Sequence, residues 1–473
     1  MFKQYIGGKL VEGKGRKLDV YNPANGELIE TLSCADAEQA KEALAAAEKA
    51  FKTWKNVPVY DRANWMLKLR DACLEDYDTL VELVMAESGR TYEFAKADVN
   101  WFITSMQYYG DEAKRTNGEV LPCPTPGSHY LVTYEPIGVT VGHLAWNYPL
   151  GNASVKLAPA VASGCTCIIK PSSETPLATL HIGALAEKIG FPEGVINIVA
   201  GPSGEVARTL NESTIPKMIS CIGSYETGLK IMEQSATSIK RYSFELGGNA
   251  PVVVMPDADL DATAANIVAK KTGFAGQTCV NYNRIYIHKD IYETMCERIA
   301  NELSKVSLGS GKDKGYIMGP MINKNARDHM LTLIKDATDN GATLVMGGTI
   351  PAEFEKGAFI TPALLRDVND DMLVSKEEIF GPIIPVQPFE TLDEAIEKSN
   401  NTIFGLSAYY FGHNAKEMNE YLMRADAGEI FVNGAGGNEF VPHSGHKQSG
   451  IGADKSKWSL ADYYQIKFLS INP

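Results

Sequence analysis

The chain has 473 residues, with 45 Lys or Arg against 58 Asp or Glu, and a formal net charge of −13 at pH 7. This acidic surplus argues against a nucleic-acid or membrane partner. The eight cysteines are too sparse for a disulfide scaffold. No two of them form a C-x-x-C pair, so the sequence indicates no zinc site of that kind. Without a signal peptide or a run of about 18 apolar residues, we expect a reduced, cytoplasmic protein that does not span a membrane.

The first part of the chain is predicted to be largely helical. Residues 35–54 are rich in Ala, Glu and Lys, a composition that favours a helix. A second helical pattern begins at Asp61 and is expected to stop at Gly89. Three prolines within residues 121–127 then predict an extended connector.

From about residue 138 onward, short β-rich runs alternate with helical stretches. The runs before residue 256 are at 138–144, 165–169, 195–199, 217–221 and 251–255. A second alternating series starts at Arg284, with helices expected at 291–306 and 323–338. This alternation predicts βαβ units, parallel sheets and two α/β lobes of roughly 200 residues each. Because neither a G-x-G-x-x-G fingerprint nor a Walker motif is present, a Rossmann-like cofactor site would have to use other residues.

Three segments carry groups suited to chemistry at a carbonyl carbon. Cys279 follows a glycine-containing turn, where a thiolate could act as a nucleophile. Glu245 precedes two glycines and could be a general base. The side-chain amide of Asn147 could donate to an oxyanion. Each residue alone is more often structural, but together they form the set that acyl chemistry requires.

Seven motifs, in the order that the family shows, resemble those of the NAD(P)-dependent aldehyde dehydrogenase superfamily over essentially the whole chain. They are Trp146-Asn147-Tyr148-Pro149, Lys170-Pro171-Ser172, Gly223-Ser224, Glu245-Leu246-Gly247-Gly248, Gly276-Gln277-Thr278-Cys279, Glu378-Ile379-Phe380-Gly381-Pro382 and Lys447-Gln448-Ser449-Gly450. The resemblance implies an α/β fold and a homodimer or homotetramer. It further implies a Rossmann-type cofactor domain (1–120 and 137–246), an α/β catalytic domain (247–445) and a small β oligomerisation arm (121–136 and 446–473).

The resemblance also implies a reaction. Cys279 would attack an aldehyde, and the resulting thiohemiacetal would be oxidised to a thioester. Asn147 and the backbone N–H of Cys279 would stabilise the oxyanion. Glu245 would activate the water that releases a carboxylate, and it could also help to deprotonate Cys279. The cofactor, NADP or NAD, would be bound by Trp146, Lys170, Ser172, Ser173, Gly204, Gly223, Ser224, Leu246, Glu378 and Phe380.

Among the positions that depart from the usual pattern of the family, four bear on the cofactor, the substrate or the nucleophile. Ser173 stands where many NAD-preferring members carry Glu, and a small hydroxyl leaves room for a 2′-phosphate, so NADP is the expected preference. Val155 stands where members that act on succinate semialdehyde or lactaldehyde tend to carry Arg, which weakens both assignments. His443 replaces the Phe of the substrate tunnel. Asn281 is unusual two residues after Cys279, which leaves the packing beside the nucleophile open.

These departures give a hypothesis about the substrate. The substrate pocket is expected to contain Tyr148, Asn152, Val155, Thr278 and His443. An imidazole can donate to a substrate oxygen or carry positive charge toward an anion, so we expect a small polar or anionic aldehyde, such as a hydroxy-, phospho- or sulfo-aldehyde. In the alternative interpretation, His443 is a loop residue that faces solvent.

Two other functions remain open at this point. A CoA-acylating relative would pass the acyl group to CoA, but such enzymes typically lack the base that Glu245 would provide. A non-catalytic binding or structural protein on this scaffold would tend to lose catalytic or cofactor residues, and Cys279, Glu245, Asn147, Lys170 and Glu378 are all present.

Overall fold

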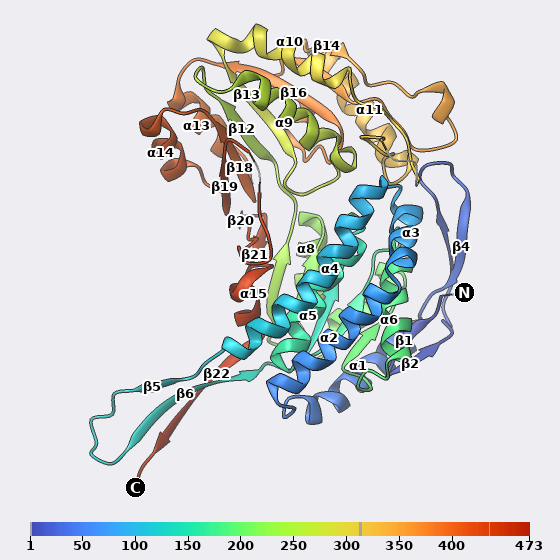
Figure 1. Ribbon diagram of the computed structural model, residues 1–473, viewed down its shortest axis with the longest axis vertical. Coiled ribbons are helices and arrows are strands. Elements are labelled where there is room, and N and C mark those ends of the chain that lie inside the picture. Colours follow the sequence, from blue (N-terminus) through green and yellow to red (C-terminus); the bar gives the residue numbers. More distant parts are fainter. Residues whose placement is uncertain (1, 312–314, 435) are drawn as a thin grey trace.

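Two sheets, each rich in parallel strands, organise the chain, which the computed structural model describes over residues 2–311, 315–434 and 436–473. In Figure 1 the first sheet and its helices form the lower lobe, the second sheet and its helices form the upper lobe, and a thin arm projects from the lower lobe. The predicted α/β class with parallel sheets is therefore confirmed.

The first sheet has eight strands, and its central strands β9, β8, β7, β10 and β11 run parallel. Every residue of β7, β8 and β9 is buried, as expected for parallel strands that are covered on both faces. Antiparallel strands close the two edges. In spatial order the strands are β2 (Lys9–Val11), β1 (Gln4–Ile6), β9 (Ile196–Ile198), β8 (Thr166–Lys170), β7 (Val139–His143), β10 (Pro216–Ile222), β11 (Arg241–Glu245) and β21 (Gly450–Ile451).

Helices cover both faces of this sheet and bury two apolar cores against it. One face carries α1 (Ala37–Trp54), α7 (Arg208–Glu212) and α8 (Tyr225–Ser235). The opposite face carries α2 (Val59–Glu75), α3 (Tyr77–Ser88), α4 (Tyr92–Glu112), α5 (Pro149–Ser163) and α6 (Leu177–Lys188). Every residue of α5 is buried, because this helix is enclosed between the sheet and the outer helices.

The helical pattern expected from Asp61 to Gly89 is divided into α2 and α3 in the structure. The division is at Asp76, whose φ of −110° and ψ of 27° lie outside the helical region. The side chain of Asp76 accepts a hydrogen bond from Thr79, which stabilises this local turn. The stop at Gly89 is confirmed, since this residue is left-handed with φ of 70°.

The second sheet has seven strands, all parallel to their neighbours except the edge strand β14. In spatial order they are β14 (Thr343–Met346), β15 (Ala363–Arg366), β16 (Ile383–Phe389), β13 (Tyr282–His288), β12 (Ala250–Val254), β18 (Ser407–Phe411) and β19 (Glu429–Val432). Three pairs of helices pack on this sheet, and each pair buries one apolar cluster. The pairs are α9 (Leu260–Thr272) with α10 (Tyr292–Leu303), α11 (Lys324–Asp339) with α12 (Leu373–Lys376), and α13 (Leu392–Asn400) with α14 (Ala415–Arg424). Within the described ranges, no helix has the length and apolar character needed to cross a membrane.

The arm is a three-stranded antiparallel sheet of β5 (Glu119–Leu121), β6 (His129–Pro136) and β22 (Tyr464–Ile471). Before β22, the chain pairs β20 (His446–Lys447) with β17 (Phe404–Gly405), adds β21 to the first sheet and forms α15 (Ser456–Asp462) against α4 and α5. A separate hairpin joins β3 (Lys17–Tyr21) and β4 (Leu28–Ser33). The domain boundaries expected from the sequence stay a prediction.

Candidate active site

A cavity of about 810 Å³ opens at the carboxyl ends of the parallel strands of the first sheet. The residues that end β7, β8, β10 and β11 line it, namely His143, Lys170, Ile222 and Glu245. Ligands bind at this edge of open α/β sheets. Every predicted site residue lines the cavity except Gly204, which lies in the short helical turn Ser203–Ala207 beside it.

Asn147 lies in the turn between β7 and α5. Pro149 is the first residue of α5, and Asp98 of α4 accepts the backbone N–H of Gly151 at 2.9 Å, which fixes the start of this helix. The buried Nδ2 of Asn147 donates to the carbonyl oxygen of Gln277 at 3.2 Å. An amide nitrogen has two N–H groups, so the second N–H can donate to a substrate oxygen.

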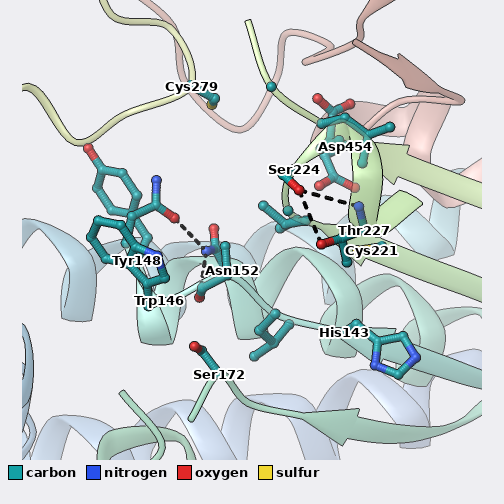
Figure 2. A pocket seen from close by; sticks show the side chains of 18 of the residues that line it. His143, Trp146, Tyr148, Asn152, Ser172, Cys221, Ser224, Thr227, Cys279 and Asp454 are labelled. Carbon is teal, nitrogen blue, oxygen red and sulfur yellow. Dashed lines mark hydrogen bonds between the residues drawn. The ribbon is translucent and has the colours of Figure 1, made fainter. Parts of the chain in front are cut away.

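Asn152, one turn into α5, holds the amide of Asn147 in this orientation. Its Nδ2 donates to Oδ1 of Asn147 at 3.1 Å and to the carbonyl oxygen of Ala145 at 3.2 Å (Figure 2). Asn152 lines the cavity, but both of its N–H groups are used within its own segment. Its role in this geometry is to orient Asn147 rather than to donate to a substrate.

The loop of Cys279 lies between the short helix Gly273–Gly276 and β13. Residues 274–276 have φ values of 49°, 52° and 71°, all in the left-handed region. At Gly276 a Cβ atom would lie 2.4 Å from the carbonyl oxygen of Gly381, so glycine is required there. This turn presents Cys279, partly exposed, to the cavity (Figure 2).

The side chain of Asn281 stabilises the same loop through hydrogen bonds to backbone groups. Its Nδ2 donates to the carbonyl oxygens of Gly276 at 2.7 Å and Gly381 at 3.3 Å, and its Oδ1 accepts the N–H of Tyr282 at 2.9 Å. Asn281, which is unusual at this position in the family, therefore fixes the backbone of the loop that contains Cys279. Within the described residues, the backbone N–H of Cys279 has no hydrogen-bond partner and is free to join an oxyanion site.

Glu245 is the last residue of β11 and is only 3% exposed. Neither of its carboxylate oxygens accepts a hydrogen bond in the described part of the chain. Burial raises the pKa of Glu245, and the neighbouring imidazole of His443 acts in the opposite direction. A buried carboxylate with no donors of its own is suited to accept a proton from a water molecule.

His443 lies between the nucleophile and the base. Its Nε2 is 3.7 Å from Sγ of Cys279 and 3.6 Å from Oε2 of Glu245. Its Nδ1 is 2.8 Å from Oε1 of Glu429, the first residue of β19. The ring therefore faces the cavity and not the solvent.

At the cofactor end of the cavity, Lys170 and Glu378 suit the riboses of a dinucleotide. Nζ of Lys170 makes one long contact among the described residues, 3.4 Å to the carbonyl oxygen of Pro171, and burial lowers its pKa to about 8. Oε1 of Glu378 accepts the N–H of Gly248 at 3.0 Å. A Cβ atom at Gly247 would lie 2.6 Å from Oε2 of Glu378, so glycine makes room for this carboxylate. A buried ammonium and a carboxylate, both short of partners, fit a ligand rich in hydroxyl groups.

Helix α8 points its first turn toward the same end of the cavity. Oγ of Ser224, the residue before α8, accepts the N–H of Thr227 at 3.3 Å (Figure 2). The positive end of a helix with free N–H groups suits a pyrophosphate. Ser172, Ser173 and Lys230 line this region too, and Lys230 was not predicted from the sequence.

Apolar groups complete the walls between the two ends. The rings of Trp146 and Phe380 meet edge to face, with their centroids 5.3 Å apart. Leu246 packs against Gly228 of α8, where a Cβ atom would lie 2.8 Å from Cδ1 of Leu246. Gly223 lines the cavity beside the start of α8. These flat and small surfaces suit the faces of cofactor rings.

On the substrate side of the cavity, two aromatic rings lie together, and the ammonium group of Lys455 lies over one of them. The rings of Trp101 and Tyr148 meet edge to face with their centroids 5.6 Å apart, and Nζ of Lys455 lies 4.6 Å from the centroid of the Trp101 ring. The hydroxyl of Tyr148 points toward the loop of the nucleophile in Figure 2. Val155 and Thr278 also line the cavity.

Four residues in or beside the cavity were not predicted from the sequence, namely Trp101, Lys230, Glu429 and Lys455. The expected helix start at Ser224 could have indicated Lys230, because residues 227, 230, 231 and 234 recur at helical spacing on one face. Trp101, Glu429 and Lys455 had no local signal, since each comes from a different distant segment and belongs to no motif.

Comparison with known proteins agrees with this site. The sequence matches the aldehyde dehydrogenase family over residues 10–469. It is 36% identical over 475 residues to glutarate-semialdehyde dehydrogenase of Pseudomonas aeruginosa, covering 100% of this chain and 98% of that protein. It is 35% identical over 475 residues to succinate-semialdehyde dehydrogenase [NADP(+)] of Escherichia coli, with the same coverage of 100% and 98%.

The fold also matches that of a solved structure over the full length of the chain. A solved structure of 3,6-anhydro-L-galactose dehydrogenase in complex with NADP superposes with a TM-score of 0.96, at 35% identity and with 100% of both chains covered. Because the match extends over both lobes and the arm, the expected Rossmann-like and catalytic parts of the fold are shown as well. The protein is thus a member of the aldehyde dehydrogenase family and an NAD(P)-dependent oxidoreductase.

Proposed function

We propose that the protein oxidises a small anionic aldehyde to its carboxylate through a thioester on Cys279. The observation that carries this proposal is the meeting of Cys279, Asn147 and Glu245 in one cavity that also has a cation on its substrate side. The bound nicotinamide would supply the hydride acceptor. Transfer to water, rather than to CoA, is favoured by the presence of the buried carboxylate of Glu245.

The first half of the reaction depends on the Cys279 loop. The thiolate adds to the aldehyde carbon, and the carbonyl oxygen takes the electron pair. The free N–H of Asn147 and the backbone N–H of Cys279 donate to this oxygen. Asn152 and Asn281 act indirectly, since each fixes one of the two donors.

The second half of the reaction depends on Glu245. Its carboxylate takes a proton from a water molecule as the water oxygen adds to the thioester carbon. Collapse of this adduct breaks the C–S bond, and sulfur leaves with the electron pair. In the described part of the chain, neither oxygen of Glu245 accepts a hydrogen bond, so each oxygen can accept one from this water.

The anionic nature of the substrate is inferred from the cavity wall and from the relatives. Glutarate and succinate semialdehydes, in the names of two relatives, both carry a carboxylate. The chain has Val155 where an Arg would serve such a group, and Lys455 offers a cation on another part of the wall. We therefore propose that the ammonium of Lys455 binds the acid group at the far end of the substrate.

A substrate panel tests this assignment. We expect kcat/KM for succinate or glutarate semialdehyde to exceed that for neutral aldehydes of equal length by about tenfold or more, the effect of one charged contact. A Lys455→Met variant keeps the aliphatic stem over Trp101 and should lose this preference while its activity on neutral aldehydes stays unchanged. Lys457→Met, which removes a nearby exposed ammonium, is the control. Equal loss on charged and neutral substrates in Lys455→Met would contradict the assignment.

We also propose that NADP is preferred to NAD. Ser173 leaves space for a 2′-phosphate, and the ammonium groups of Lys170 and Lys230 line the same cavity. Ser173→Glu should lower kcat/KM for NADP relative to NAD by about tenfold or more, because a carboxylate repels the phosphate. Initial rates with both cofactors measure this ratio, and Ser173→Gln is the uncharged control. No measurable turnover of NADP by the unmodified protein would disprove the preference.

We further propose that the arm carries the contact of a homodimer or homotetramer. Its strands expose apolar side chains, of which Val120 is 77%, Ile466 71% and Phe468 55% exposed. Strands at the edge of a sheet with exposed apolar side chains tend to pair with another chain.

A further inference from the structure

The imidazole of His443 contacts three ionisable groups, and the third of them has no role in the reaction described so far. Nε2 of His443 is 3.7 Å from Sγ of Cys279 and 3.6 Å from Oε2 of Glu245. Nδ1 is 2.8 Å from Oε1 of Glu429. The side chains of His443 and Glu429 are only 15% and 14% exposed, so these contacts are shielded from water.

We propose that His443 is the catalytic base that ionises Cys279, and that Glu429 is the positioning residue that orients its ring. In this step the S–H bond of Cys279 breaks, its electron pair stays on sulfur and a new N–H bond forms at Nε2. The product is a thiolate beside an imidazolium, a pairing that activates cysteine nucleophiles in general. The inference rests on Cys279 as the nucleophile, but not on the identity of the aldehyde.

Glu429 selects the tautomer that this step requires. A carboxylate can only accept, so Nδ1 must carry a proton to donate to Oε1 of Glu429, and Nε2 then presents its lone pair to Cys279. Glu429 is itself fixed, because it starts β19 and its backbone N–H donates to the carbonyl oxygen of Leu406 at 3.0 Å. Nucleophile, imidazole and orienting carboxylate form the same chain of contacts that activates nucleophiles on unrelated folds.

The backbone of His443 is held as firmly as its ring. His443 and Asp454 exchange two backbone hydrogen bonds, of 2.8 Å and 2.7 Å. The side chain of Asp454 forms a buried ion pair with Lys156, with an N–O distance of 2.6 Å. A ring held through both its backbone and Nδ1 can keep Nε2 within reach of Sγ throughout the reaction.

The charges around His443 favour its protonated form. Burial lowers the pKa of His443, but Glu245, Cys279 and Glu429 outweigh burial and raise it well above its ordinary value. The other charged groups in this region are Asp454, Lys156, Lys270 and Lys455. Once His443 has taken the proton of Cys279, these charges therefore stabilise the imidazolium beside the thiolate.

The test measures the reactivity of the thiol directly, without aldehyde or cofactor. The full-length protein is alkylated with iodoacetamide at several pH values, and modification of the Cys279 peptide is followed by mass spectrometry. We expect fast alkylation to persist at about pH 6, where an isolated thiol is almost fully protonated. In His443→Phe, which places the usual family residue here, the rate at this pH should fall about tenfold or more and recover in alkali.

Two further variants separate a base from a structural residue. Glu429→Gln keeps the shape of the contact but removes the charge, and it should show a smaller loss of acidic reactivity in the same direction. His443→Gln should behave as His443→Phe does, and thermal unfolding of each variant shows that the fold is intact. His446→Gln, which changes an exposed histidine nearby, should alkylate as the unmodified protein does.

The outcomes are separable from those of the proposed function. If His443→Phe and His443→Gln fold and show the same pH dependence of Cys279 alkylation as the unmodified protein, the inference is overturned. The same result for Glu429→Gln would overturn the role of Glu429. Turnover retained after complete alkylation of Cys279 would instead remove Cys279 as the nucleophile, and with it the proposed reaction.

Discussion

Replacement of Cys279 by serine should abolish turnover while the cofactor still binds. Serine keeps the size of the side chain, but its hydroxyl is not ionised by an imidazole at neutral pH as a thiol is. We expect kcat to fall by on the order of 10⁴-fold or more, since removal of a nucleophile removes the covalent route altogether. Steady-state assays of reduced nicotinamide measure kcat, and titration of cofactor fluorescence measures binding.

The matched control for this experiment is Cys123→Ser. Cys123 is the other cysteine that is partly exposed in the structure, and it lies in the connector between β5 and β6, far along the arm from the cavity. The six remaining cysteines are buried. A Cys279→Ser variant that retains turnover comparable to Cys123→Ser would remove the thioester mechanism.

Glu245→Gln should separate the two halves of the reaction. Glutamine has the shape of glutamate but cannot take a proton from water, so oxidation should proceed once and hydrolysis should stall. We expect a burst of about one reduced nicotinamide per site, followed by a kcat lowered by about 10²- to 10⁴-fold. Stopped-flow absorbance resolves the burst, and mass spectrometry should find the acyl group on Cys279.

The pH dependence of hydrolysis provides a second measurement on the same residue. A general base works only when it is deprotonated, and burial raises the pKa of Glu245. The hydrolytic rate of the unmodified protein should therefore continue to rise with pH beyond the range of an ordinary carboxyl group. Glu245→Gln should lack this rise, whereas Glu390→Gln on the surface should keep it. Loss of the burst itself would move Glu245 to a step before oxidation.

The sequence predicted the parts of the site that depend on short motifs. The turn at residues 276–279 has a cause that is partly local, because the φ of 71° at Gly276 favours glycine there. The same holds for Ser224 at the start of α8 and for Gly89 at the end of α3. Element types were also predictable, since alternation of apolar runs reflects burial in a parallel sheet.

What the sequence could not show are the contacts between distant segments. Asn152 was expected to face the substrate, but in the structure its amide donates to the side chain of Asn147. Helical spacing alone does not predict with which neighbouring group an amide forms its hydrogen bonds. Glu429 is separated from His443 by a strand and a loop, so their pairing depends on where β19 starts in the second sheet. Lys455 meets Trp101 only because the chain before α15 returns to α4.

One continuous stretch, residues 443–471, joins the reaction centre to the arm. It runs from the paired backbones of His443 and Asp454 through α15 to β22, whose register with β6 is unbroken over Tyr464–Ile471. The backbone that positions the imidazole of His443 is thus continuous with the last strand of the arm, so the loop beside the nucleophile and the edge of the arm belong to one segment of chain.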